Sequence, residues 1–172
     1  MIAVADSGPL CYLSLISQTS LLPQLFEKVL IPAEVQKELS RPSSPPQVFA
    51  LAQDCPLWLE VHAVASVPSA LSTLGPGEQE AITLASSVHA DVFLTDDKKA
   101  KYTAHTMSIA ASGTIGVLYA AGMDDRVPFT AQDFDHAIRL LLQTNFRYDS
   151  SLQLAIKYLS GKLHKYHGTP GR

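Results

Sequence analysis

Short apolar segments alternate with segments of helical character along most of this chain, and this alternation restricts its fold more than any other feature. The apolar runs at 2–5, 29–31 and 91–95 have the length and composition of buried strands. Helical spacing follows them, for example over 32–39 and 97–105. Strands that alternate with helices predict an α/β sandwich, with helices on both sides of a mostly parallel sheet.

The other expected elements are less sharply marked. The stretch 40–46, Ser-Arg-Pro-Ser-Ser-Pro-Pro, is the clearest linker because it is too rich in Pro and Ser to continue a helix. The tail after Ser160 is expected to be frayed. The remaining predicted elements are helices over 9–16, 21–28, 74–90, 113–122, 130–143 and 150–160, and strands over 59–64 and 107–111.

Composition describes an ordinary globular protein. The chain has 172 residues, 47% hydrophobic and 17% charged, which is enough to bury one core. No apolar run approaches the ~20 residues that a membrane-spanning helix needs. The N-terminus lacks the basic segment of a signal peptide, so we expect a cytoplasmic protein. Cys11 and Cys55 show no metal-ligand spacing, and no phosphate-binding glycine loop occurs.

Charge is unevenly distributed. The net charge is −3, but the segment from Ile138 onward carries six Lys or Arg residues, ending at Arg172, against one acid, Asp149. A basic end on an acidic body suits a polyanion, although a solvated basic helix explains the same pattern.

Acidic residues follow two of the predicted strands directly. Asp6 comes after the strand at 2–5, and Asp96 comes after the strand at 91–95. Ligands of parallel sheets bind beyond the carboxyl ends of the strands, so both carboxylates are expected at one edge.

Further acids fall on the neighbouring predicted helices. Grouped carboxylates repel one another by about 4 kcal/mol at ~4 Å and an effective dielectric of ~20, and Mg²⁺ or Mn²⁺ relieves that repulsion. Each acid also has a simpler explanation: Asp6 and one of the two adjacent aspartates can cap helices, and the glutamates can lie on solvated helix faces. The candidate residues are Asp6, Glu38, Glu78, Glu80, Asp96 and Asp97.

The segments that carry these acids resemble the PIN-domain nucleases. They are "VADSGPL", "VLIPAEVQKEL", "LGPGEQEAI", "VFLTDDKKA" and "GTIGVL", in the order of that family and spread over about residues 2–122. The likeness is greatest to the VapC-like toxin branch, in which the third acid lies in a GxGExEAI-type helix. The last fifty residues resemble the helical extension of that branch only loosely.

The resemblance implies a role for each acid. Asp6 would be the first metal ligand, with Ser7 beside it, and Glu38 would be the second acid. The third acid would be Glu78, with Glu80 as the second choice. The fourth would be Asp96, with Asp97 as the second choice. The implied metal ligands are Asp6, Glu78 and Asp96.

Four side chains are weaker candidates for contact with the substrate. Ser7, Lys98, Lys99 and Thr114 lie close in sequence to the acids, and Lys101 follows on the same helix. For Thr114 a helix-capping hydroxyl is the favoured explanation, and a solvated face explains at least one of the lysines.

The resemblance therefore implies a Mg²⁺- or Mn²⁺-dependent endoribonuclease, the toxin of a bacterial toxin–antitoxin pair, with RNA as substrate, a small antitoxin as partner and a homodimer as the common assembly. We expect a PIN-like domain over 1–125 and a helical extension over 126–172 packed on it. One alternative is a PIN scaffold that has lost catalysis and binds nucleic acid or protein. A haloacid-dehalogenase-type phosphatase ranks lower, because "ADSGPL" lacks the second aspartate of its motif.

Overall fold

The computed structural model describes residues 1–168, so Arg172 lies outside the described residues. At its centre is a five-stranded sheet in the order β3-β2-β1-β4-β5, and all the strand pairings in the described part of the chain are parallel. The strands are β1 (Ile2–Ala5), β2 (Lys28–Pro32), β3 (Leu59–His62), β4 (Val92–Leu94) and β5 (Ala111–Ser112). The predicted α/β sandwich around a mostly parallel sheet is confirmed.

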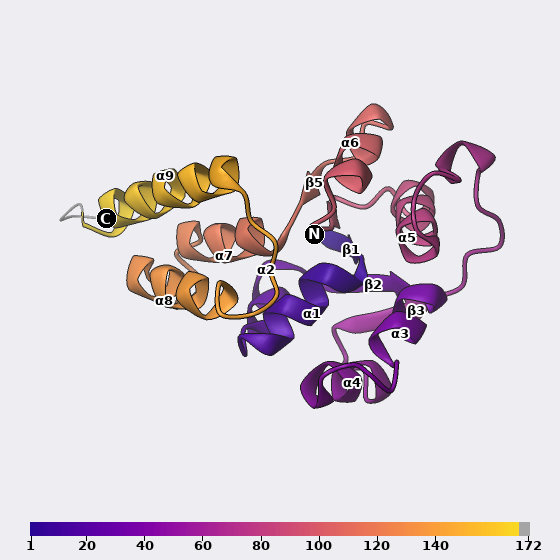
Figure 1. Ribbon diagram of the computed structural model, residues 1–172, viewed down its shortest axis with the longest axis horizontal. Coiled ribbons are helices and arrows are strands. Elements are labelled where there is room, and N and C mark those ends of the chain that lie inside the picture. Colours follow the sequence, from indigo (N-terminus) through magenta and orange to yellow (C-terminus); the bar gives the residue numbers. More distant parts are fainter. Residues whose placement is uncertain (169–172) are drawn as a thin grey trace.

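Helices connect the strands and continue beyond the last of them (Figure 1). Two short 3₁₀ helices, η1 (Thr19–Leu21) and η2 (Ser69–Leu71), lie in the connections. The α-helices are α1 (Ser7–Leu15), α2 (Leu22–Leu25), α3 (Ala33–Leu39), α4 (Pro46–Gln53), α5 (Pro76–Ser87), α6 (Lys98–Thr106), α7 (Thr114–Met123), α8 (Ala131–Leu141) and α9 (Ser150–His167).

The order of the strands determines which helices cover which face. The chain moves outward in one direction from β1 to β2 to β3, and then crosses back over β1 to place β4 on its other side. Because such crossovers are right-handed, α1 and α5 cover opposite faces of the sheet. Helix α5 accordingly packs against β1, β2 and β4, whereas α1 packs with α3, α4 and α7.

Burial of both faces explains why the central strands are uniformly apolar. Val4, Ile31 and Phe93, one from each of the three central strands, are 0% exposed. A strand that is covered on both sides has no solvent face on which to alternate polar residues, which is the pattern of parallel sheets.

The C-terminal helices form a bundle with α7 on one side of the sheet (Figure 1). Leu163 of α9 is fully buried, and its Cδ2 atom would lie 2.8 Å from a Cβ added to Gly122 of α7. His164 Nε2 lies 2.7 Å from Asp135 Oδ2 of α8. These contacts extend α9 to His167, so the predicted frayed tail after Ser160 is wrong.

Two other expectations about the elements need correction. The strand predicted over 107–111 is wrong for most of its length, because Ser108 has φ = 59° in a turn and β5 contains only Ala111 and Ser112. Helix α4 was not predicted after the linker. Its first residue is Pro46, which has no N–H to satisfy and suits the first turn of a helix.

No helix among residues 1–168 is both long enough and apolar enough to cross a membrane. The carboxyl ends of β1 and β4 lie side by side, because Ala5 is in register with Leu94 and the N–H of Asp6 donates to Leu94 O at 2.8 Å. The residues that follow these two strands therefore share one edge of the sheet.

Candidate functional site

Asp6 is held at the carboxyl edge of the sheet by the first turn of α1. It is the N-cap of that helix, and its Oδ1 accepts a hydrogen bond from the N–H of Ser7 at 2.7 Å. Its Oδ2 accepts a hydrogen bond from the hydroxyl of Thr95, which is 0% exposed, at 3.1 Å. Asp6 is itself only 7% exposed, so this carboxylate is buried between two elements.

Burial and neighbouring acids make the charge of Asp6 unfavourable. Desolvation, followed by the charges of Glu78 and Glu38, raises the pKa of Asp6 to about 6, and the hydrogen bonds from Ser7 and Thr95 offset part of this rise. No Lys, Arg or His within residues 1–168 forms an ion pair with it. The site therefore lacks positive charge at its most buried carboxylate.

Asp96 lies at the same edge and is held by the start of α7. The N–H of Thr114 donates to Asp96 Oδ1 at 2.8 Å, and the Thr114 hydroxyl donates to Oδ2 at 2.6 Å. The N-cap position of α7 is occupied by Gly113, so the helix-capping role expected for Thr114 is wrong. Burial raises the pKa of Asp96, while the Thr114 hydrogen bonds and the charge of Lys101 lower it.

Gly113 makes this approach between Asp96 and α7 possible. A Cβ added to it would lie 2.4 Å from Asp96 Oδ1 and 2.9 Å from Thr95 O, closer than real Cβ contacts. Its φ of −136° suits any residue, so the close approach, not the backbone conformation, demands glycine here.

The adjacent acids Asp96 and Asp97 have different tasks. Asp97 is exposed and is the N-cap of α6, where its Oδ1 accepts a hydrogen bond from the N–H of Ala100 at 2.8 Å. This is the capping role expected for one of the pair, and it leaves Asp96 as the residue at the edge of the sheet.

Glu38 reaches the edge from α3. The Ser7 hydroxyl donates to Glu38 Oε2 at 2.7 Å, so Ser7 links Asp6 and Glu38 through its backbone and its side chain. A Cβ added to Gly77 would lie 2.8 Å from Glu38 Oε1, and this second close approach brings α5 against the acid. Arg41 Nη2 lies 3.9 Å from Glu38 Oε1 on the exposed side.

Glu78 and Glu80, the two candidates for the third acid, face different partners. Glu78 Oε2 accepts a hydrogen bond from the N–H of Gly75 at 2.7 Å, at the start of α5, and its charge raises the pKa of Asp6. Glu80 Oε2 accepts a hydrogen bond from the N–H of Glu34 at 3.2 Å, at the start of α3. Of the two, Glu78 is the one whose charge acts on Asp6.

The carboxylate oxygens of this edge suit a hard divalent cation, but in this structure they do not converge on a single position. Within residues 1–168, no group of three His, Cys, Asp or Glu side chains has the arrangement of a metal site. Each acid instead has a hydrogen-bond donor of the protein, and each carboxylate oxygen keeps a lone pair free for a metal. Carboxylate oxygens are the ligands that Mg²⁺ and Mn²⁺ prefer, so the chemistry of the set fits such an ion.

The lysines of α6 diverge from one another. Lys98 Nζ forms an ion pair with Asp149, and Lys99 Nζ donates to the carbonyl of Thr73. Lys101 is half-buried and turns inward, since its Nζ would lie 2.8 Å from a Cβ on Gly113. Of these three lysines, Lys101 therefore reaches the acidic edge.

Sequence reasoning missed Thr95, Gly77 and Gly113 as parts of this edge. Thr95 is the last residue of an apolar run, and a buried hydroxyl at a strand end is a weak signal by itself. The glycines stood within quoted motifs, but their role depends on which acid approaches them in three dimensions.

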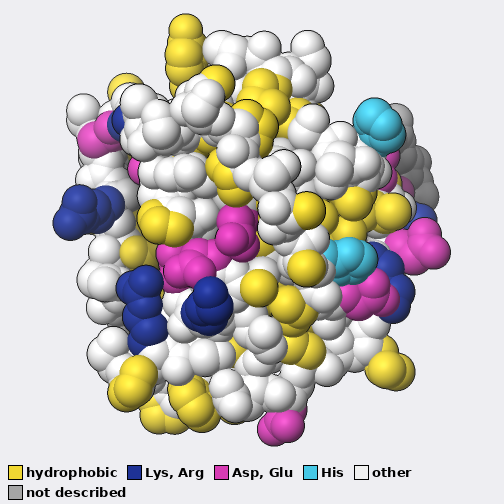
Figure 2. All heavy atoms as spheres, turned by 90° about the vertical axis from the view of Figure 1, so that its right-hand side faces the viewer, with side chains coloured by type: hydrophobic (Ala, Val, Ile, Leu, Met, Phe, Trp, Pro, Cys, Tyr) yellow, Lys and Arg dark blue, Asp and Glu magenta, His cyan; other side chains and the backbone are white. Residues whose placement is uncertain are grey.

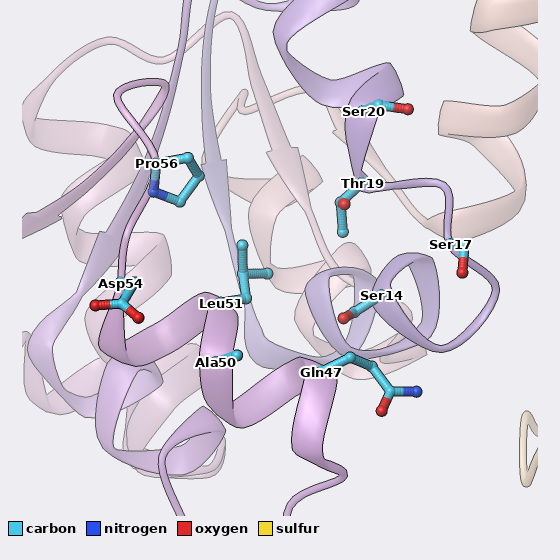
Figure 3. Close-up of a pocket in the computed structure, with 9 residues that line it drawn as sticks. All are labelled: Ser14, Ser17, Thr19, Ser20, Gln47, Ala50, Leu51, Asp54 and Pro56. Atoms are coloured by element: carbon cyan, nitrogen blue, oxygen red, sulfur yellow. The ribbon is translucent and has the colours of Figure 1, made fainter.

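A pocket that is separate from the acidic edge lies at the C-terminal end of α1, the opposite end from Asp6 (Figure 3). It has a volume of about 550 Å³ and lies between the C-terminal part of α1 and α4. Its lining is mostly hydroxyl and apolar side chains, with Asp54 as the one charged residue. It brings together no catalytic combination of side chains.

Five parallel strands with acidic residues at their carboxyl edge define a three-layer α/β protein with an acidic site. A family model described as a PIN domain matches residues 2–161, which is most of the chain. The chain belongs to the PIN domain family, and the expected resemblance is confirmed at that level. PIN domains are generally nucleases and usually use divalent metal ions.

One solved structure is similar to this chain over its full length. It is a PilT N-terminus domain protein from the archaeon Sulfolobus solfataricus P2, 15% identical, with a TM-score of 0.48. The match covers 87% of this chain and 100% of that one. A comparison with curated proteins finds no significant match.

Proposed function

We propose that this PIN domain is a Mg²⁺- or Mn²⁺-dependent endoribonuclease of the VapC-like toxin branch. The observation that supports this most strongly is Asp6: a 7%-exposed carboxylate with a raised pKa, no ion-pair partner in residues 1–168, and two further acids acting on it. A buried anion of this kind favours binding of a cation.

The proposed ligands are Asp6, Glu78 and Asp96, with Glu38 as the fourth acid. When bound, the divalent ion would supply charge for the phosphodiester and lower the pKa of a water molecule. Ser7 and Thr95 orient Asp6, and Thr114 orients Asp96, so each carboxylate is fixed by a donor that leaves part of its oxygen surface free. Glu38 lies beside Ser7, where it can accept a proton from the attacking water.

The proposed biological setting rests on the resemblance to the VapC-like toxin branch. We infer a cytoplasmic protein that pairs with a small antitoxin and forms homodimers, with the nuclease domain ending near residue 125. The packing of α8 and α9 on α7 supports treating the described residues from 126 to 168 as an extension of the same domain.

The decisive experiment measures cleavage of a labelled single-stranded RNA with Mn²⁺, Mg²⁺ or EDTA. Wild-type protein should cleave only with a divalent ion, and Asp6→Asn should lower the rate by at least about a hundredfold. Asp54→Asn is the matched control, because it removes an exposed carboxylate far from the edge and should cleave normally. Cleavage that persists in EDTA or in Asp6→Asn would contradict the proposal.

A PIN scaffold that binds nucleic acid without cutting it is the second candidate. The observation in its favour is that each acid already has a donor within the protein and that no three of them form a metal site in residues 1–168. Wild-type protein that binds RNA but cleaves none at any divalent-ion concentration would favour this candidate over the nuclease.

A further inference from the structure

A second hollow adjoins the acidic edge directly, because Asp96 forms part of its wall. It has a volume of about 360 Å³ and lies between α6, the turn from β5 to α7, the α8–α9 connection (residues 142–149) and the start of α9. Basic and apolar side chains line different parts of it. The residues that matter below are Lys98, Lys101, Phe146, Arg147, Leu152 and Leu159.

The three cations of this pocket are not equally free. Lys98 is neutralised by its ion pair with Asp149. Lys101 faces Asp96 without forming an ion pair, although its charge lowers the pKa of that carboxyl. Arg147 is exposed and has no carboxylate within ion-pair distance in the part of the chain that the structure describes. The pocket therefore presents an uncommitted guanidinium beside a half-buried ammonium.

Arg147 is held in place by its neighbours on both sides. Phe146 is 8% exposed and packs edge-on against Tyr12 of α1, with ring centroids 4.9 Å apart. Asp149 caps α9 through the N–H of Leu152 at 2.9 Å and also binds Lys98 of α6. The α8–α9 connection is thus held by contacts with α1, α6 and the start of α9, and its Arg147 lines the pocket.

We propose that this pocket binds one nucleotide of the substrate strand, next to the bond that is cut. Arg147 and Lys101 would hold its phosphate, and the apolar wall of Phe146, Leu152 and Leu159 would receive its base. A guanidinium recognises phosphate through paired hydrogen bonds, and bases of single strands stack on aromatic and apolar side chains. This inference rests on the proposed function, because it places the nucleotide relative to the acids.

The pocket also gives a role to one residue of the basic C-terminal segment, Arg147. Arg147 belongs to the segment after Ile138 in which bases outnumber acids, and the fold brings that segment to Asp96. Recognition of the strand would then come partly from the C-terminal extension, whereas the acids belong to the preceding part of the chain, at two strand ends and on α3 and α5.

Fluorescence anisotropy of a labelled single-stranded RNA decamer in EDTA tests the pocket without chemistry. Arg147→Ala should weaken binding about tenfold, as expected for one charge-assisted phosphate contact, and should reduce the slope of log Kd against log salt by about 0.7. Arg139→Ala is the matched control, since it removes an exposed arginine of α8 that does not line the pocket. Its affinity and salt slope should equal those of wild type.

A decamer with abasic positions tests the apolar wall, and wild type should bind it more weakly than the intact decamer. Equal affinity of wild type for the abasic and the intact decamer would contradict the proposed contact with the base. If Arg147→Ala and Arg139→Ala bind the intact decamer equally well, or if wild type does not bind it, the pocket proposal is wrong. The two proposals can be contradicted separately. If cleavage depends on Asp6 but Arg147→Ala binds RNA as wild type does, the pocket proposal is wrong and the nuclease proposal stands. If binding depends on Arg147 but no RNA is cleaved, the nuclease proposal is wrong.

Discussion

Replacing Asp6 with Asn should make the protein more stable at neutral pH while it abolishes the proposed activity. Asp6 is buried, receives hydrogen bonds from Ser7 and Thr95, and experiences the charges of Glu78 and Glu38. An amide of the same shape keeps the acceptor for the Ser7 N–H and removes the negative charge. The variant therefore separates the charge of this position from its packing.

The size of the effect follows from the pKa. The folded protein holds the proton of Asp6 with a pKa of about 6, against 3.8 for an ordinary aspartate. Between these two values the folded state binds more protons than the unfolded state, so wild-type stability falls as the pH rises through that window. The loss is about 3 kcal/mol, at 1.36 kcal/mol per pH unit, and it stays lost above pH 6.

The measurement is urea unfolding of wild type and Asp6→Asn in EDTA at several pH values from 4 to 8. Of the full change of about 3 kcal/mol, about 2.5 kcal/mol in favour of Asn should fall between pH 4 and pH 8, because the unfolded-state aspartate is already partly ionised at pH 4. Any constant offset, such as a weaker hydrogen bond to Thr95, cancels in that change with pH. Asp54→Asn should stay within about 0.5 kcal/mol of wild type at every pH.

Mn²⁺ should then reverse the order of the two proteins. An ion that binds the folded state stabilises wild type according to its concentration and dissociation constant, and Asp6→Asn lacks a proposed ligand. A difference that does not change with pH, or that favours Asp at pH 8 in EDTA, would refute the account of Asp6 as an unneutralised buried charge.

Three further changes test other parts of the edge. Gly113→Ala places a Cβ 2.4 Å from Asp96 Oδ1 and should lower the rate of RNA cleavage at least about tenfold. Gly161→Ala is the control, because a Cβ at that position has nothing within 4 Å, and it should cleave normally. Equal rates for the two variants would contradict the close approach of Asp96 to Gly113. Asp97→Ala removes the cap of α6 and should lower the free energy of unfolding by about 1 kcal/mol in urea while cleavage persists, and loss of cleavage would make Asp97 a ligand instead. Phe146→Ala should lower the free energy of unfolding by about 3 kcal/mol in urea and weaken binding of the RNA decamer, because the pocket loses its aromatic wall and the α8–α9 connection loses its contact with Tyr12. Unchanged binding would contradict both the base contact and the positioning of Arg147 through Phe146.

The sheet could be predicted from the sequence because its strands are buried on both faces. Runs such as those at 2–5 and 92–94 are apolar throughout, and the alternation with helices then predicts a parallel arrangement. The edge strand β5 was misplaced because it has only two residues and pairs on one side alone. The length of α9 was missed because its support, the contact of Leu163 with Gly122, is distant in sequence.

The acidic edge was predictable only in part. Parallel topology places Asp6 and Asp96 at the same edge, as strand order requires. Which donors hold them depends on side chains from other elements. Thr95 was not a candidate, and Thr114 was considered as a helix cap or a substrate contact, not as the donor to Asp96. Likewise, Arg147 was counted as part of a basic end, but its place at the pocket depends on the packing of Phe146 on Tyr12 and on the contacts of Asp149 with α6 and α9.

The position of β1 in the middle of the sheet has a consequence during synthesis. This strand leaves the ribosome before both of its neighbours, one of which, β4, begins at Val92, and Asp6 accepts the hydrogen bond of the Thr95 hydroxyl from 89 residues further along. A partly made chain therefore carries Asp6 without the strand that completes its surroundings. An enzyme built on this plan would stay harmless to its own messenger and ribosome until β4 and Thr95 have been synthesised.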